Sequence, residues 1–348
     1  MSNKEKIGWC AGVILLVILY LLSSTDLIIK EKKKEIFRVS VIVDQVNDNY
    51  YGNFREGMNM AEKKYQADVN FITLYAENDE KTIDKDEKTM YVTGVNCKAK
   101  TAYEEMQQDE LIVREVKDGT NAIILAPVRE DHAVMQLDEI SPGCPVIFLG
   151  ASTISSSVAC SISVDRYEMG RSLGEKIVEN ETPEIPVCLF TEGLSYTGNT
   201  DTYDGLRSVL DQAGFSVSLI EKRNEDTYRK TIEGTVYPEN GKIMAVGMDV
   251  GALSDLADIL EGSGVYREHV TALYGIGSTT KLLNQMDKGI VTGLMAWNRF
   301  DEGYLSVEKA VQAAGGEWNE KQITLTPEYI DDGILKSGTY EKLLYPME

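Results

Sequence analysis

Histidine and paired cysteines are scarce in this 348-residue sequence. The two histidines, His132 and His269, stand alone, and none of the five cysteines forms a C-x-x-C pair. Zinc sites and Ser-His-Asp triads need several such side chains together, so the sequence predicts neither. The odd cysteine count also argues against a disulfide framework, although a bridge between Cys144 and Cys160 stays open.

The motifs of nucleotide binding and nucleophilic catalysis are also missing. No Gly-rich loop ends in Lys and Ser or Thr, and no G-x-G-x-x-G follows the first expected strand. The sequence from Gly193 to Tyr196 begins a nucleophile elbow but lacks its last glycine. Acidic pairs such as Asp331-Asp332 are unremarkable among 56 acidic residues. We therefore expect no enzyme activity, no metal and no cofactor.

Positive charge is in deficit, with 35 Lys and Arg against 56 Asp and Glu and a net charge of −21. Nucleic-acid binding requires clustered basic side chains, so a nucleic-acid partner is not expected. A composition that is 43% hydrophobic and 26% charged is typical of a folded globular chain. The length leaves room for two domains, each with its own core.

Long apolar runs are limited to one, Ile7 to Ile29, whose core is Ala11 to Leu22. It approaches the roughly 20 residues that a spanning helix needs. No A-x-A cleavage site follows it, and Cys10 precedes the core, whereas a lipidated cysteine would follow it. We therefore expect an uncleaved membrane anchor and linker over residues 1–36, with a cleaved signal peptide as the alternative.

The charges beside this segment do not favour an external domain. The lysines of Lys30 to Lys34 outnumber Lys4 and Lys6, and this count alone would keep the following domain in the cytoplasm. Long domains can cross a membrane despite such flanks. The fold expected for the rest of the chain therefore decides, and it favours an extracytoplasmic binding domain on a single-pass anchor.

After residue 36, strand-like and helix-like patterns alternate. This alternation predicts parallel sheets with right-handed crossovers, and the scheme restarts after about residue 183. The expected strands are 37–45, 69–75, 121–127, 145–150, 158–165, 186–191, 215–220, 242–246, 271–276 and 290–296, with helices between them and a last extended segment over 323–330. The polar stretch Glu77 to Lys100 is either an elaboration near a cleft or a surface loop.

The first strand leads into a loop with the chemistry of a sugar site. In a doubly wound sheet such a loop lies at the carboxyl end of the strand, where ligands bind. Tyr50 and Tyr51 could sandwich a sugar ring while Asn47 and Asp48 hydrogen-bond to its hydroxyls. The alternative is a packed loop in which these side chains bind nothing.

The second half of the chain offers a similar set. Trp297 and Asn298 directly follow the strand that ends at residue 296, and form a second pair of aromatic ring and amide. Asp249 and Asp165 each end a strand, where a carboxylate serves as a ligand or, more commonly, as a helix cap. We expect Asp249 in the site and Asp165 at a hinge.

These segments, taken in order, resemble the type I periplasmic binding proteins, and most closely their ribose-binding-like branch. The resemblance covers about Phe37 to Asp332 and rests on VIVDQVNDNYYGNFREGM, AIILAPV, ISVDRYEMGRSLGEKI, YDGLRSVL, IMAVGMDVGALSDL and GIGSTTKLLNQMDKGIVTGLMAWNRFDEGYLSVEKAV. It implies two doubly wound parallel-sheet, Rossmann-like domains joined by a hinge. The N-terminal lobe would comprise 37–165 with about 300–322, and the C-terminal lobe 166–299 with about 323–348.

The resemblance also implies a function and partners. Members of this family close two lobes around a small sugar-like ligand, and the matching positions here are Asp48, Tyr50, Tyr51, Asp249, and Trp297 or Asn298. They deliver the ligand to the permease of an ABC importer, while some membrane-anchored relatives report it to a sensor histidine kinase.

Several positions depart from the sugar-binding pattern. The fourth strand ends in Gly150-Ala151 where Asp-Arg is usual, and Met248 and Gly277 replace an Asn and an Asp. An ordinary monosaccharide held by the usual polar contacts is therefore not assured. The alternatives are a regulatory ligand-sensing domain like that of LacI-type repressors, although no helix-turn-helix precedes Phe37, and a ligand-free protein-interaction module.

Overall fold

The computed structural model describes residues 2–24, 36–44, 50–74, 97–140, 143–153, 155–222, 228–236, 241–317 and 320–338. The chain forms two units, Met1–Ile36 and Phe37–Glu348. Helix α1 (Asn3–Ser24) belongs to the first unit. Within the described ranges, no helix combines the length and apolar character needed to cross a membrane. The apolar segment expected over Ile7 to Ile29 extends beyond them, because residues 25–35 are not described.

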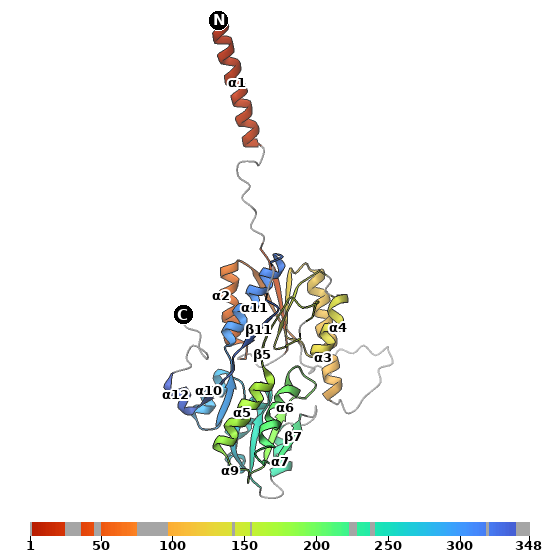
Figure 1. Cartoon of the computed structure of the whole chain (residues 1–348), viewed down its shortest axis with the longest axis vertical. Coiled ribbons are helices and arrows are strands. Elements are labelled where there is room, and N and C mark those ends of the chain that lie inside the picture. The colour runs from red at the N-terminus through yellow and green to blue at the C-terminus, as the bar shows by residue number, and fades with distance from the viewer. Residues whose placement is uncertain are drawn as a thin grey trace. The chain divides into compact units, whose positions relative to one another are not determined.

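The second unit contains two six-stranded sheets in its described part (Figure 1). The first has the order β11-β5-β4-β3-β1-β2, and all its strand pairs are parallel. The second has the order β12-β10-β9-β8-β6-β7 and is parallel except where β12 joins β10. The expected pair of parallel α/β lobes is thereby confirmed. The strands of the first sheet are β1 (Arg38–Val43), β2 (Asp68–Thr73), β3 (Ala122–Leu125), β4 (Val146–Leu149), β5 (Cys160–Val164) and β11 (Gln322–Leu325). Those of the second are β6 (Val187–Thr191), β7 (Val217–Glu221), β8 (Ile243–Gly247), β9 (Val270–Ile276), β10 (Gly293–Ala296) and β12 (Glu328–Asp331).

Helices cover both faces of each sheet. In the first lobe, Val41 of β1 packs with α2 (Gly52–Tyr65) and α11 (Arg299–Ala314), whereas its neighbour Ile42 packs with α3 (Cys97–Lys117) and α4 (Glu130–Ile140). Successive strand residues point to opposite faces, so a continuous apolar run such as β1 needs a helix layer on each side. In the second lobe the helices are α5 (Arg166–Asn180), α6 (Asn199–Leu210), α7 (Tyr228–Val236), α8 (Val250–Gly262), α9 (Gly264–His269), α10 (Thr280–Asp287) and α12 (Asp332–Ser337).

Glycine pairs bring two helices of each lobe into backbone contact. A Cβ atom on Gly57 of α2 would overlap the carbonyl oxygen of Phe300, and one on Gly303 of α11 would overlap that of Phe54. Gly170 of α5 and Gly205 of α6 have the same relation in the second lobe. Because only glycine allows such an approach, these positions fix how α2 packs on α11 and how α5 packs on α6.

In the described ranges, the chain passes between the lobes three times. Strand β5 lies in the first sheet and α5 packs on α6 of the second lobe, while β10 lies in the second sheet and α11 packs on α2 of the first. The third passage lies between β11 and β12, so the expected single segment 323–330 is wrong: it forms two strands in different sheets. Thr326-Pro327 separates them, and proline supplies no N–H to continue a strand.

Two further expectations concern cysteines and the polar stretch. Cys144, Cys160 and Cys188 are free thiols, so the bridge that the sequence left open between the first two is not formed. Residues 77–96 of the stretch Glu77 to Lys100 lie outside the described residues, and α3 begins at Cys97, four residues earlier than expected.

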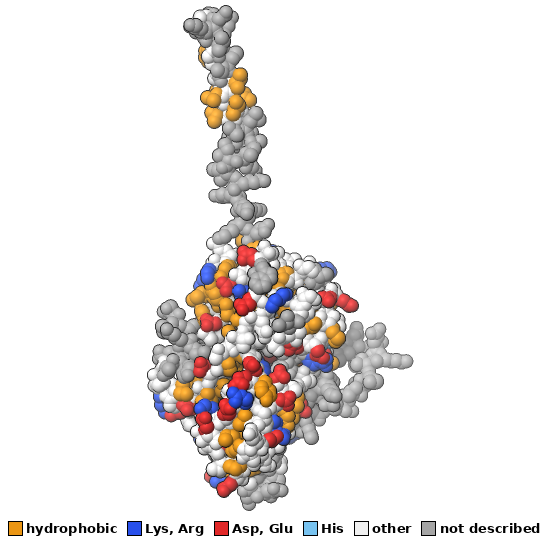
Figure 2. All heavy atoms as spheres, viewed as in Figure 1, with side chains coloured by type: hydrophobic (Ala, Val, Ile, Leu, Met, Phe, Trp, Pro, Cys, Tyr) orange, Lys and Arg blue, Asp and Glu red, His pale blue; other side chains and the backbone are white. Residues whose placement is uncertain are grey.

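Charged side chains of both signs are interspersed over the visible face of the second unit (Figure 2). No large basic patch is seen among the described residues on this face.

Candidate functional site

A cavity of about 450 Å³ lies between the two lobes. It is lined by residues that follow the carboxyl ends of strands in both sheets, where open α/β sheets bind ligands. From the first lobe come the ends of β1, β3 and β4, and from the second those of β6, β7, β8, β9 and β10. The polar, charged and aromatic side chains that line the cavity include Asp44, Tyr50, Tyr51, Glu104, Arg166, Glu192, Tyr196, Thr197, Lys222, Asp249, Ser254, Asp255, Trp297, Arg299 and Glu302.

A buried ion pair forms one wall. Arg299 and Glu302, 9% and 2% exposed, join through Nη1 and Oε2 at 2.5 Å. The indole Nε1 of Trp297 donates to the same Glu302 oxygen at 3.0 Å. The Arg299 guanidinium also lies 4.4 Å from the centre of the Tyr50 ring. Burial is the largest single effect and lowers the pKa of Arg299, but Glu302 and the weaker contributions of the nearby tyrosines and Asp44 together outweigh it. The pKa of Arg299 is therefore raised above its ordinary value.

The two tyrosines of the first loop differ in their environment. Tyr51 is 5% exposed, packs edge-on against Phe54 and Phe71, and donates its hydroxyl to Asp44. Burial, together with the nearby Asp44 carboxylate, raises the pKa of Tyr51 well above its ordinary value. Among the described residues, the Tyr50 hydroxyl has no hydrogen-bond partner. Tyr51 is therefore part of the wall, and Tyr50 presents a free hydroxyl beside it.

Asp249 combines a structural contact with a place in the cavity. Its carboxylate caps α8 by accepting from Ala252 N at 2.8 Å, and accepts from Thr191 Oγ1 and Glu192 N at 2.9 Å each. Burial raises its pKa to about 6, and the nearby Glu192 adds to the effect while these hydrogen bonds oppose it.

The structure brings four of the expected ligand-binding residues together. The same cavity is lined by Tyr50, Tyr51, Asp249 and Trp297. Asn298 is not among the lining residues, because its side chain caps α11 by accepting from Asp301 N at 2.9 Å. Asp48 lies outside the described residues.

Two other expected positions lie beside the cavity. Asp165, expected at a hinge, caps α5 by accepting from Glu168 N at 2.8 Å, at the first passage between lobes. Gly150, where the sugar-binding pattern has an acidic residue, lines the cavity without a side chain.

Sequence reasoning missed the cations of the cavity. Arg166 directly follows Asp165, and Arg299 directly follows Asn298, so each is the first residue of a helix at a passage between lobes. Lys222, at the end of β7, pairs with other lining residues, Glu192 at 2.9 Å and Asp255 at 2.8 Å. A basic residue directly after a capping Asp or Asn at a strand end was the signal available for both arginines.

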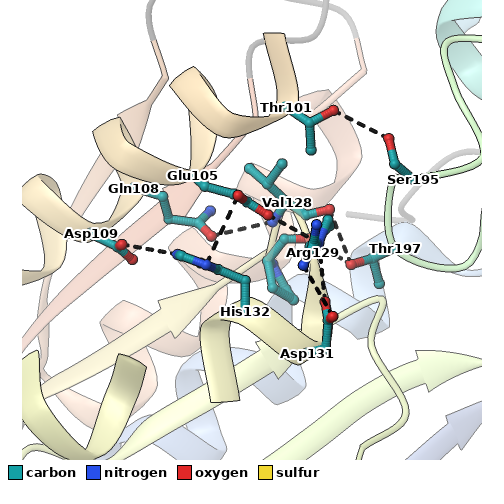
Figure 3. Close-up of polar contacts among 11 residues, drawn as sticks. Thr101, Glu105, Gln108, Asp109, Val128, Arg129, Asp131, His132, Ser195 and Thr197 are labelled. Carbon is teal, nitrogen blue, oxygen red and sulfur yellow. Dashed lines mark hydrogen bonds and ion pairs between the residues drawn. The ribbon is translucent and has the colours of Figure 1, made fainter. Parts of the chain in front are cut away.

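Hydrogen bonds join the lobes beside the cavity (Figure 3). Thr197 of the second lobe donates its backbone N–H to Val128 O at 3.1 Å and its hydroxyl to Pro127 O at 2.9 Å. The hydroxyls of Thr101 and Ser195 lie 3.2 Å apart. These contacts hold the lobes together over the cavity.

The first-lobe side of this junction is itself braced. Gln108 of α3 accepts from Val128 N at 3.2 Å and donates to Ala126 O at 2.9 Å, and Arg129 pairs with Glu105 at 3.1 Å (Figure 3). The backbone that meets Thr197 is therefore held in position by α3.

Comparison with solved structures shows the same fold. A glucose-galactose binding protein from Geobacillus stearothermophilus is 14% identical with a TM-score of 0.70, over 86% of this chain and 98% of that one. A carbohydrate transporter solute binding protein from Agrobacterium radiobacter, in complex with D-arabinose, is 15% identical with a TM-score of 0.72, over 89% and 99%. An ABC transporter solute binding protein from Agrobacterium vitis, bound with alpha-D-tagatopyranose, is 13% identical with a TM-score of 0.71, over 89% and 100%.

Among curated proteins, no sequence matches this chain significantly. A family model described as a periplasmic binding protein domain matches residues 39–317, which is most of the chain. Members of that family bind ligands and are not enzymes, in agreement with the missing catalytic motifs. The chain therefore belongs to the periplasmic binding protein family, of type I.

Proposed function

We propose that this protein is an extracytoplasmic solute-binding protein whose two lobes close on one sugar-like molecule. The observation that carries this proposal is the cavity itself, in which the aromatic wall of Tyr50 and Trp297 stands beside hydroxyls of both lobes. In the described chain, neither the Tyr50 nor the Ser254 hydroxyl has a hydrogen-bond partner. Such a mixture suits sugars, because their rings have apolar faces and hydroxyl edges.

Closure is the event that a partner would detect. A ligand that contacts both lobes stabilises the closed state by its differential contacts, and the Thr197 hydrogen bonds to the first lobe form only when the lobes meet. The ligands named for the similar structures, D-arabinose and tagatose, support a sugar as the class of ligand.

We also propose that α1 anchors the protein to the membrane. From Val13 to Tyr20 every side chain is apolar or aromatic, and each is 48–72% exposed, which leaves an apolar surface around the helix (Figure 2). This stretch is too short to span alone, and the rest of the expected segment would complete it. The protein should stay with membranes through alkaline carbonate washing, and a variant with Leu16→Glu and Leu19→Glu should be released; release of both would contradict an anchor.

Two membrane partners fit such a protein, the permease of an ABC importer and a sensor histidine kinase. An uncleaved anchor favours the kinase, because it keeps the binding domain beside a membrane receptor. If the protein senses, removal of residues 1–36 should abolish signalling and spare ligand binding. Signalling that survives this deletion would contradict the sensing role.

Sugar binding is tested by titration calorimetry on the full-length chain. The panel is D-glucose, D-galactose, D-arabinose and D-tagatose, together with D-glucuronate and D-galacturonate. We expect at least one to bind with 1:1 stoichiometry. Tyr50→Phe should then weaken binding about 2- to 10-fold, the effect of one hydrogen bond. The control Tyr167→Phe removes a hydroxyl from a 45% exposed ring outside the cavity and should leave affinity unchanged. Absence of binding by the whole panel would refute the proposal.

A further inference from the structure

Arg166 carries a positive charge into the cavity without an acceptor for it. It is the first residue of α5, and its guanidinium carbon lies 5.1 Å from the centre of the Trp297 ring. The Nε atom is buried and has no hydrogen-bond partner. Within the described ranges, Arg166 also makes no ion pair. The side chain as a whole is half-buried. Charges that are withdrawn from water, even in part, are normally paired, because the loss of hydration is costly.

The neighbouring backbone holds this side chain in place. A Cβ atom on Gly198 would lie 2.9 Å from Arg166 Cγ, and one on Gly150 would lie 3.7 Å from its Nη2. Gly198 belongs to the second lobe and Gly150 ends β4 of the first. The Arg166 guanidinium is therefore seated between the two lobes, against the face of Trp297.

The cavity has more acidic than basic side chains, but each of its acidic side chains already pairs with, or accepts a hydrogen bond from, another group of the protein. Glu302 is paired with Arg299, and Glu192 and Asp255 share Lys222. Asp249 accepts three hydrogen bonds. The other lining carboxylates accept from a tyrosine hydroxyl or pair with a lysine: Asp44 from Tyr51, Glu104 from Tyr196, and Asp258 with Lys281. Of the cavity's described charges, Arg166 is the one left without a hydrogen bond or ion pair.

We propose that Arg166 binds an anionic oxyacid group, a carboxylate or a phosphate, on the ligand, so that the preferred ligand is an acidic sugar. This inference rests on the proposed function. A guanidinium presents paired N–H groups that match the two oxygens of such a group. The Tyr50 and Ser254 hydroxyls then face the uncharged part of the ligand, and the Trp297 ring supports the guanidinium from behind.

The test compares sugars that differ only at C6. Full-length protein is titrated with D-glucose, D-glucuronate and D-glucose 6-phosphate, and with D-galactose and D-galacturonate. We expect one acidic sugar to bind at least about tenfold more tightly than its neutral counterpart, the effect of a charge-assisted hydrogen bond. The 6-phosphate distinguishes the two anionic groups, since a carboxylate site should favour the uronate and a phosphate site the phosphate ester.

Variants then connect this preference to Arg166. Arg166→Gln should weaken binding of the acidic sugar about tenfold or more and change that of the neutral sugar by less than about threefold. Arg166→Lys keeps the charge but loses the paired N–H groups, so it should retain part of the preference. The control Arg207→Gln alters a surface pair with Asp211 and should change neither affinity. Circular dichroism checks that each variant is folded. The comparison of acidic with neutral sugars uses the wild-type protein alone, so it does not depend on the folding of any variant.

The outcomes separate the two proposals. If neutral sugars bind as tightly as acidic ones, or Arg166→Gln weakens both equally, this inference is overturned while sugar binding stands. If no sugar of either kind binds, the proposed function fails and this inference fails with it.

Discussion

The buried ion pair of the cavity allows a stringent test of how the site is held together. Replacing Glu302 by Gln keeps the shape of the side chain but leaves the Arg299 guanidinium without its counter-ion in a wall where it is 9% exposed. Breaking a buried pair from one side costs about 3–5 kcal/mol. The Tyr50 ring 4.4 Å away compensates part of the charge, so we expect about 3 kcal/mol of lost unfolding free energy.

The assay is urea unfolding followed by circular dichroism. Glu179→Gln is a matched control, because Glu179 forms a pair with Lys176 of the same i,i+3 spacing in which both side chains are exposed, at 60% and 39%. This control should cost less than about 0.5 kcal/mol. The double variant Arg299→Met, Glu302→Gln removes both charges and should cost at least about 2 kcal/mol less than the sum of the single changes. A cost below about 1 kcal/mol for Glu302→Gln, or additive single effects, would refute this account of the wall.

Three more predictions follow from single positions. Gly303→Ala should lower the unfolding free energy by about 1–3 kcal/mol in the same urea assay, because the added Cβ would overlap the backbone of α2. The control Gly234→Ala, which has open space around it, should raise the unfolding free energy by up to about 1 kcal/mol. Equal effects of the two substitutions would contradict the close helix contact. The pKa of Asp249 is about 6 in the folded chain and 3.8 ordinarily, so the folded state binds the proton more strongly and this residue's contribution to stability falls as pH rises from about 4 to 6. Between about pH 4 and 6 the unfolding free energy of Asp249→Asn, measured with urea, should fall by about 2 kcal/mol less than that of the wild type. A pH profile equal to that of the wild type would be inconsistent with a buried carboxylate. Thr197→Val removes the hydroxyl bond between lobes and should weaken sugar affinity about 2- to 10-fold by calorimetry with little change in melting temperature; unaltered affinity would mean that closure does not use this contact.

Much of the fold could be predicted from local patterns. The β-branched run at Val39, Val41 and Ile42 is buried on both faces, as continuous apolar runs are in parallel sheets. The expected segment 323–330 failed because its apolar pattern continues through Thr326-Pro327, whereas the hydrogen-bonding pattern does not.

The site was less predictable, since its parts are distant in sequence. Tyr50 and Trp297 line one cavity because the ends of two sheets face each other, and strand-end position indicated both. The contact of Arg166 with Trp297 spans 131 positions and depends on where α5 begins, which a pattern of residues does not specify. Asn298 illustrates the opposite difficulty: at the same strand end, capping a helix and binding a ligand use the same side-chain groups.

We propose above that a sugar-like ligand binds between the lobes. Hydrogen exchange of the full-length chain, with and without the tightest-binding sugar of the calorimetric panel, tests it most directly. We expect slower exchange on both sides of the cavity, at the amides of Ala126 and Val128 in the first lobe and in residues 249–254 of the second, with distant elements unchanged. Protection confined to one lobe, or located away from the cavity, would contradict it.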